Sequence, residues 1–176
     1  MTFKQSIPRL VTGEIILSSM PAIALQALEQ GLDTPSLRIL AGLGEDENGF
    51  VLTRYLNDTL RELFIELPDK RSAAIEVGLL IAEEIFEGKR PVYEGTQEIL
   101  WTLDRYPFYE ESRNRRYDSI GFENIYVMFL TMEDLKGSGV IPWHPDPLNE
   151  LSVKQHNDLL TALKEWATRM KVGFTL

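Results

Sequence analysis

The chain has 176 residues and carries 18 Lys and Arg against 27 Asp and Glu, which gives a formal net charge of −9. It contains no Cys and only two His, so a disulfide framework, a thiolate metal site, an iron–sulfur cluster and a cysteine nucleophile are excluded. The acidic balance argues against general nucleic-acid binding, because such binding needs Lys and Arg facing the phosphates.

The length is typical of one domain, so residues 1–176 are expected to form a single helical domain. Composition suggests a weak sub-division into a helical core, 1–106, and a segment 107–176 with charged and aromatic residues, a Pro-rich loop and a final helix. A membrane span needs about 20 mainly apolar residues, and the chain has no such run. Pro8 and Gly13 interrupt the N-terminal segment, which does not read as a signal core, so a cytoplasmic protein is expected.

The first predicted helices are short and clearly delimited. Residues 20–31 form an apolar segment that ends at Gly31. Thr34 is a good N-cap for the next helix, with Pro35 in its first turn and Gly42 at its end.

An amphipathic helix is expected between residues 50 and 67. Its apolar positions follow the three-and-four spacing of a helix and include Leu63 and Phe64 at the end of the buried stripe.

The segment 70–88 is the most apolar helix candidate, and Asp69 is a good cap for it. Its apolar face is broad, which indicates a central helix with neighbours on more than one side. The small residues Ala74, Gly78 and Ala82 recur every four positions, and this stripe would let one neighbouring helix approach closely.

Pro91 opens another helix that runs to about residue 105. Gly95 inside it costs up to about 1 kcal/mol relative to Ala, so we expect a neighbouring helix to approach the backbone there. Residues 120–135 fit a strand or a helix, and the helix is favoured because an isolated strand has nothing to pair with.

The C-terminal part consists of a loop and a helix. Residues 141–147 are rich in Pro and form the loop, and Ser152 with Gln155 makes a capping box for a helix that ends at Gly173. The whole pattern predicts an all-α bundle of about seven helices around the central helix at 70–88.

The common catalytic and ligand motifs are absent. The chain has no GxxxxGK[ST] or GxGxxG loop, no GxSxG elbow, no HExxH, and no Glu three residues before either His. The acidic stretch before Gly49 does not make a calcium loop, because Gly44 and Tyr55 would stand at its first and twelfth ligand positions. No catalytic residue, cofactor or metal is therefore predicted.

The loop 141–147 has the most unusual composition in the chain, because prolines stiffen a group made of Trp143, His144 and Asp146. A pre-ordered loop of this kind can contact a ligand or a partner at little entropic cost. The favoured interpretation is a Pro-rich connection with Trp143 folded onto the core, and catalysis by His144 and Asp146 would need a nucleophile that the sequence does not single out.

A second candidate site lies on the helix after Pro91 and comprises Tyr93, Glu94, Glu98 and Trp101. Glu94 and Glu98 are one helical turn apart and could act as paired carboxylates. Acids at this spacing are more often a solvated face, and that reading is favoured.

Two charged runs complete the candidates. Arg113, Arg115 and Arg116 beside Tyr117 could contact RNA or an acidic partner, although the acids nearby favour internal ion pairing. The second run comprises Glu45, Asp46 and Glu47, which are candidates for an acidic surface. The acidity is concentrated toward the N-terminus, since residues 1–88 hold 7 Lys and Arg against 14 Asp and Glu.

Part of the chain resembles a group of small, largely uncharacterised bacterial helical proteins. The resemblance covers about residues 9–101. It is carried by an apolar helix ending in Gly, an Asp-Thr-Pro-Ser-Leu segment, a Leu-Ala-Gly segment and a later Pro-x-Tyr-Glu-Gly segment. The residues concerned are Met20–Ala22, Asp33–Arg38, Leu40–Leu43, Ala82, Ile85, Gly88, Pro91, Tyr93–Gly95 and Trp101. It implies a bacterial cytoplasmic origin and brings no catalytic residues.

The leading functional expectation is a non-enzymatic interaction protein, of a regulatory or immunity type, that holds a basic protein partner on an acidic helical surface. The alternative is a small-ligand-binding protein or an enzyme that uses the Trp143–His144–Asp146 loop and the Tyr93–Trp101 helix. A mimic of nucleic acid would need a continuous row of carboxylates at phosphate-like spacing. The oligomeric state is not predicted.

Overall fold

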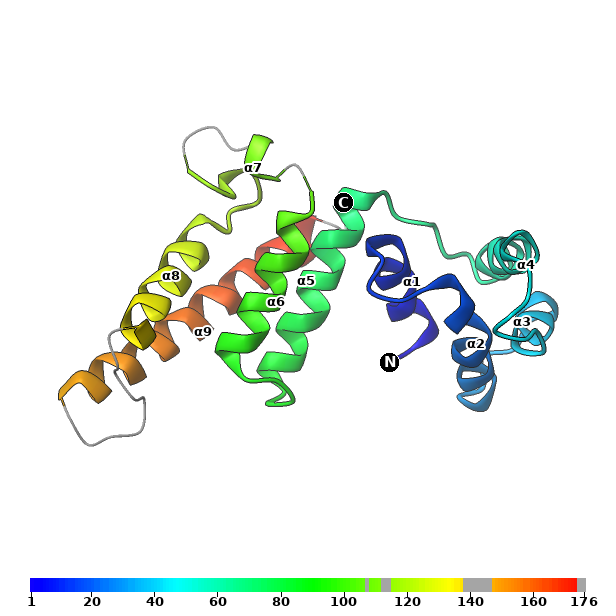
Figure 1. The fold of residues 1–176 in the computed structure, drawn as a ribbon, viewed down its shortest axis with the longest axis horizontal. Helices are drawn as coiled ribbons and strands as arrows, with labels where there is room; N and C mark the ends of the chain where they lie inside the picture. Colours follow the sequence, from blue (N-terminus) through cyan, green and yellow to red (C-terminus); the bar gives the residue numbers. More distant parts are fainter. Residues whose placement is uncertain (107, 112–114, 138–146, 174–176) are drawn as a thin grey trace. The chain divides into compact units, whose positions relative to one another are not determined.

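The structure, a computed structural model, describes residues 1–106, 108–111, 115–137 and 147–173, and every regular element in these ranges is helical (Figure 1). The all-α prediction is confirmed. The α-helices in chain order are α1 (Phe3–Thr12), α2 (Met20–Glu29), α3 (Pro35–Ala41), α4 (Gly49–Glu62), α5 (Lys70–Phe86), α6 (Val92–Asp104), α7 (Phe108–Glu111), α8 (Glu123–Gly137) and α9 (Pro147–Gly173). Two short 3₁₀ helices, η1 (Leu17–Ser19) and η2 (Asp118–Ile120), precede α2 and α8.

The contacts divide the chain into two compact units, Met1–Glu76 (unit 1) and Val77–Leu176 (unit 2), and each is described by itself. The division falls inside α5, whereas composition placed the weak sub-division after residue 106. A single domain over residues 1–176 stays a prediction.

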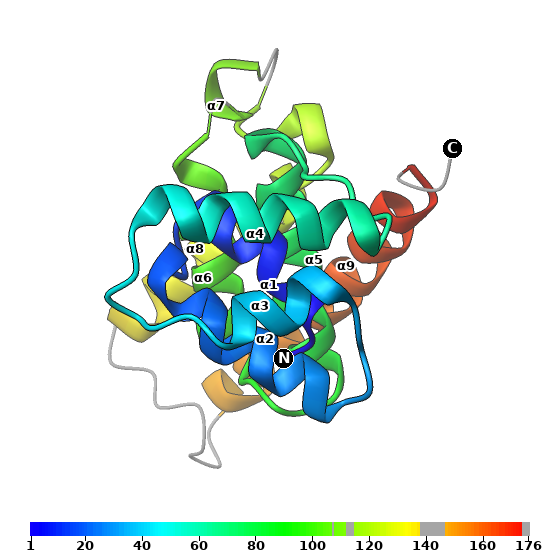
Figure 2. The same cartoon turned by 90° about the vertical axis from the view of Figure 1, so that its right-hand side faces the viewer.

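Unit 1 is built on consecutive helices that pack against one another. Helix α2 lies against α3, α3 lies against α4, and α1 lies against α2, as Figures 1 and 2 show. The buried apolar side chains of this unit form one core, which comprises Phe3, Ile7, Met20, Ala24, Ala27, Leu37, Leu40, Leu52, Leu56 and Leu60.

Helix α1 forms although its segment contains Pro8. A capping box starts it: the Thr2 N–H donates to the Gln5 side chain at 2.9 Å, and the Gln5 N–H donates to the Thr2 hydroxyl at 3.3 Å. Phe3 and Ile7 are buried one turn apart, so core packing outweighs the backbone hydrogen bond that proline cannot donate.

The predicted caps of α3 and α5 are confirmed. The Leu37 N–H donates to the Thr34 hydroxyl at 3.3 Å, and the Ser72 N–H donates to the Asp69 carboxylate at 3.0 Å. Helix α4 is shorter than expected, because it ends at Glu62 instead of continuing to residue 67.

In unit 2, α6 packs against α8 and α9, and α8 and α9 lie side by side (Figure 1). The predicted close approach to α5 occurs at Gly78, where an added Cβ would lie 3.2 Å from the Trp166 ring of α9 and 3.4 Å from Ile99 of α6. Trp166 is fully buried, and its indole N–H donates to the Ile120 carbonyl at 3.1 Å.

Two C-terminal predictions have different outcomes. Residues 123–137 form α8, so the helical interpretation of residues 120–135 is confirmed. The predicted helix start at Ser152 is wrong, because α9 already begins at Pro147 and runs through it. The remainder of the predicted loop, residues 141–146, lies outside the described residues.

Among the helices that the structure describes, none has the length and apolar character needed to cross a membrane.

Candidate functional site

Tyr93, the first candidate on α6, is turned onto α8. Its ring stacks on Phe129 with centroids 5.0 Å apart, and its hydroxyl donates to the Glu133 carboxylate at 2.9 Å. Burial raises the pKa of Tyr93 to about 12, and the hydrogen bond to Glu133 adds to that rise. Tyr93 therefore joins two helices of unit 2.

Glu98 is also engaged inside unit 2. The Arg90 guanidinium lies 2.6 Å from the Glu84 carboxylate and pairs with Glu98 as well. Glu94 and Glu98 are thus not two equivalent free acids, and the arrangement does not resemble a pair of catalytic carboxylates.

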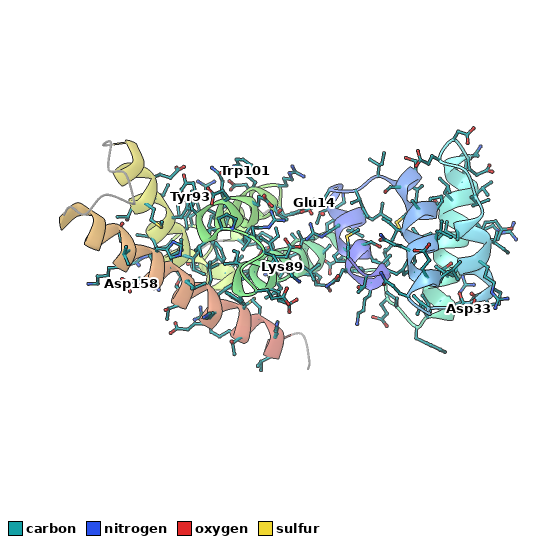
Figure 3. All side chains as sticks on the ribbon, turned by 90° about the horizontal axis from the view of Figure 1, so that it is seen from below. Glu14, Asp33, Lys89, Tyr93, Trp101 and Asp158 are labelled. Atoms are coloured by element: carbon teal, nitrogen blue, oxygen red, sulfur yellow. The ribbon has the colours of Figure 1, made fainter. Side chains whose placement is uncertain are left out.

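Glu94 and Trp101 are the exposed residues of the predicted α6 site. They are seven residues apart, which places them on the same helical face, and Trp101 is 59% exposed at the edge of unit 2 (Figure 3). Glu94 is exposed and makes no ion pair within the described part of the chain.

The acids of the front half lie in the turn between α3 and α4. Glu45, Asp46 and Glu47 are all exposed, and none of them forms an ion pair with a described residue. Asn48 then caps α4 by accepting the Phe50 N–H at 2.8 Å, so the three acids directly precede a helix N-terminus.

Phe50 is a functional candidate that sequence reasoning missed. It stands in the first turn of α4 and is 88% exposed, three residues after the last of the acids. The available signal was Asn48, a favoured N-cap residue, which indicates that the helix starts before Phe50 and not at it. We call Glu45, Asp46, Glu47 and Phe50 together the acidic loop surface.

Phe64 is the clearest departure from the predicted pattern. The amphipathic spacing placed it on the buried face, but α4 ends before it and its side chain is 95% exposed. The Phe64 N–H donates to the Arg61 carbonyl at 3.2 Å and the Ile65 N–H donates to the Leu60 carbonyl at 2.9 Å, which is a Schellman ending.

The position that Phe64 occupies in this ending normally favours glycine. Its φ is 54°, whereas the equivalent residues after α2 and α5 are Gly31 and Gly88, with φ of 87° and 69°. A side chain in the left-handed region costs about 1 kcal/mol or more. Phe64 is therefore held exposed in a strained backbone, a combination that points to function more than to stability.

A pocket of about 490 Å³ lies beside Phe64 in unit 1. It is formed where the start of α1, the end of α2 and the end of α4 meet, and it is lined by Thr2, Phe3, Lys4, Ala27, Gln30, Gly31, Leu32, Leu63, Phe64 and Ile65. Sequence reasoning missed this pocket because it depends on three segments that are far apart in the chain.

The candidate loop residues Trp143, His144 and Asp146 lie outside the described residues, as do Arg113 and Asn114.

Arg116, from the basic run, is bound within unit 2. It pairs with Asp104 at 2.7 Å and lies over the rings of Tyr117 and Tyr126, 5.3 and 5.1 Å from the ring centroids. This arrangement is an internal ion pair and not a free basic patch.

No group of three or more His, Asp or Glu in the described ranges is arranged to hold a metal ion. Comparison with known proteins finds no matching family model, no similar curated protein and no similar solved structure.

Proposed function

We propose that this protein is a non-enzymatic interaction protein, of a regulatory or immunity type, and that it binds a basic protein partner through the acidic loop surface. The observation that carries the proposal is the exposure of Phe50 next to three carboxylates that form no ion pair with a described residue. We place the protein in the bacterial cytoplasm as part of the same proposal, on the resemblance over residues 9–101.

The distribution of ion pairs in unit 1 supports this choice of surface. Several other acids lie beside a cation of the same unit: Glu14 with Arg9 at 2.9 Å, Asp33 with Arg38 at 2.5 Å and Asp58 with Arg61 at 3.0 Å. The carboxylates of residues 45–47 form no ion pair with a described residue, so their charge is available to attract a partner. Clustered charges of one sign attract and orient a partner of the opposite sign.

Phe50 supplies the apolar contact that charge alone does not. Binding energy at protein interfaces is concentrated in a few side chains, and aromatic residues are frequent among them. An exposed ring beside three acids therefore fits a partner segment in which Lys or Arg residues flank an apolar side chain.

The same acids also have a structural effect, because carboxylates before a helix N-terminus interact favourably with its dipole. A decisive variant must therefore remove their charge and keep their shape. The combination Glu45→Gln, Asp46→Asn and Glu47→Gln does this, and urea unfolding of that variant measures any loss of stability separately.

The experiment is affinity capture from the cells of origin with the full chain as bait. The wild type is expected to retain one stoichiometric protein with a basic surface, and both the triple amide variant and Phe50→Ala are expected to lose it. Trp101→Phe is the matched control, since it alters an exposed aromatic residue of unit 2. Retention of the partner by the triple variant, or recovery of a metabolite with no protein, would contradict the proposal.

A second candidate function, small-ligand binding, is favoured by the α6 face. Trp101 and Glu94 lie on one face of that helix, and an indole with a carboxylate on the same face suits an organic cation. The loop residues Trp143, His144 and Asp146, which the sequence suggests for this alternative, lie outside the described residues. Choline is a suitable probe, and calorimetry that shows saturable binding to the wild type and none to Trp101→Ala would favour this function.

A further inference from the structure

The strained residue Phe64 and the pocket beside it form one patch of unit 1, which we call the Phe64 patch. Phe64 projects from the end of α4, while the partly buried Leu32, Leu63 and Ile65 contribute apolar surface to the pocket. A projecting ring and a cavity thus lie next to each other on the same surface.

We propose that a second copy of this chain occupies this patch, and that the Phe64 ring of each copy enters the pocket of the other. A two-fold symmetric contact requires one patch that is complementary to itself, with the inserted group and its receptor side by side. The Phe64 patch meets this condition. A pocket of about 490 Å³ is in the size range that accepts small organic ligands, so a phenyl ring fits within it.

The charges at the patch are also self-complementary. Lys4 is the one charged residue among those that line the pocket, and Glu66 follows the lining residue Ile65 in the chain. Both side chains are exposed and neither forms an ion pair with a described residue. Lys4 does attract Glu76, where it partly opposes the rise in the pKa of Glu76 that burial causes. In the proposed dimer, Lys4 of each copy therefore pairs with Glu66 of the other.

This dimer would leave the acidic loop surface free. Phe50 and Phe64 flank α4 at its two ends, and a helix of 14 residues is about 21 Å long. The inference therefore goes beyond the proposed function and does not depend on it. The two can fail separately, because the triple amide variant should still dimerise and a Phe64 variant should still capture the basic partner.

The experiment is sedimentation equilibrium of the full chain over a wide range of protein concentration at physiological ionic strength. The wild type is expected to approach about 40 kDa, twice the 20.2 kDa of one chain. Phe64→Gly is expected to weaken dimerisation by about thirtyfold or more, as loss of a central interface residue does. The same variant should be at least as resistant to urea as the wild type when both are monomeric, because glycine removes the backbone strain.

Two further variants make the test specific. Phe50→Ala removes an equally exposed ring at the other end of α4 and should dimerise as the wild type does. Lys4→Glu and Glu66→Lys should each weaken the dimer, and the two together should restore it. A wild type that stays at 20.2 kDa at all concentrations, or a dimer that Phe64→Gly does not weaken, would overturn the proposal. Failure of the double reversal to restore the dimer would overturn the Lys4–Glu66 pairing.

Discussion

The carboxylate of Glu62, at the end of α4, binds Ser36 in the first turn of α3. The Ser36 backbone N–H donates to Oε2 at 3.0 Å and the Ser36 hydroxyl donates to Oε1 at 2.6 Å. Helix α3 has seven residues, which is too short to be stable alone, so this contact across 26 residues of chain fixes its start against α4.

The first prediction concerns the pH dependence of stability that this contact creates. The pKa of Glu62 is lowered from its ordinary value of 4.5, first by the Ser36 hydroxyl and then by Thr34. A lowered carboxyl pKa stabilises the fold above the unfolded value, and that stabilisation is lost as the pH falls through the lowered folded value.

Urea unfolding of wild type and Glu62→Gln checks this prediction. The variant should be less stable near neutral pH, and the difference should shrink once the solution is acidic enough to protonate Glu62 in the wild type. Glu29→Gln is the control, because Glu29 is exposed and forms no ion pair with a described residue, so its loss should change little. A difference that is independent of pH would show that the charge of Glu62 is not what stabilises α3.

The second prediction concerns Gly95 in α6. A Cβ at this position would lie 2.6 Å from Ile85 Cδ1, 2.7 Å from Ile85 Cγ1 and 3.0 Å from Arg90 Cδ. Gly95→Ala should therefore lower the free energy of unfolding by about 1–3 kcal/mol, the usual cost of overpacking, despite the better helix propensity of Ala.

Two further variants make the Gly95 test specific. Gly49→Ala has nothing within 4 Å of the new Cβ and should not destabilise α4. Ile85→Val removes Cδ1, so adding it to Gly95→Ala should recover part of the lost stability. A Gly95→Ala variant as stable as the wild type would contradict the packing account.

Gly95 also shows what the sequence could predict. A glycine inside a helical pattern indicates a close neighbour, and the neighbour is a residue of the adjacent helix, as expected. Thr34 and Asp69 were predicted equally well, because an N-cap depends on the few residues that follow it. At these positions the neighbouring residues in the sequence were enough to predict the local structure.

Phe64 shows why other features could not be predicted. Its spacing continues the apolar stripe of α4, but the helix ends before Phe64. Because its backbone is left-handed, the helical periodicity no longer predicts which way its side chain points. Similarly, α1 forms although it contains Pro8, because Phe3 and Ile7 are buried in the core. At the α6 candidate site, Trp101 is exposed, whereas Tyr93 contacts Phe129 and Glu133 of α8. A binding role for this face stays a prediction.

The third prediction is the ionisation of Tyr93. Burial and the Glu133 carboxylate raise the pKa of Tyr93 to about 12 from an ordinary value of 10.0. Because the neutral phenol is favoured in the folded state, its contribution to stability is complete below the unfolded pKa and is lost as the pH rises from about 10 to about 12.

The ultraviolet absorbance of tyrosinate measures this pKa when the titration of Tyr93→Phe is subtracted from that of the wild type. Glu133→Gln should move the Tyr93 transition to lower pH, since it removes a negative charge next to the phenol. A Tyr93 transition near the ordinary value in the folded wild type would contradict the contact between α6 and α8.

The fourth prediction concerns Trp166. Its N–H is the donor to the Ile120 carbonyl, and its ring meets the Phe122 ring edge-on with centroids 4.8 Å apart. Trp166→Phe should cost about 1–3 kcal/mol, because a buried carbonyl loses its donor and the smaller ring leaves space. Trp101→Phe, at an exposed position, should leave the urea midpoint unchanged, and equal effects of the two variants would be evidence against a buried Trp166.

The central claim is that the acidic loop surface binds a basic partner, and the salt dependence of that binding tests it most directly. Titration calorimetry of the captured partner against wild type should show an affinity that falls as the salt concentration rises. The variant with Glu45→Gln, Asp46→Asn and Glu47→Gln should bind more weakly and with a flatter salt dependence. Equal affinity and equal salt dependence of the two proteins would contradict the claim.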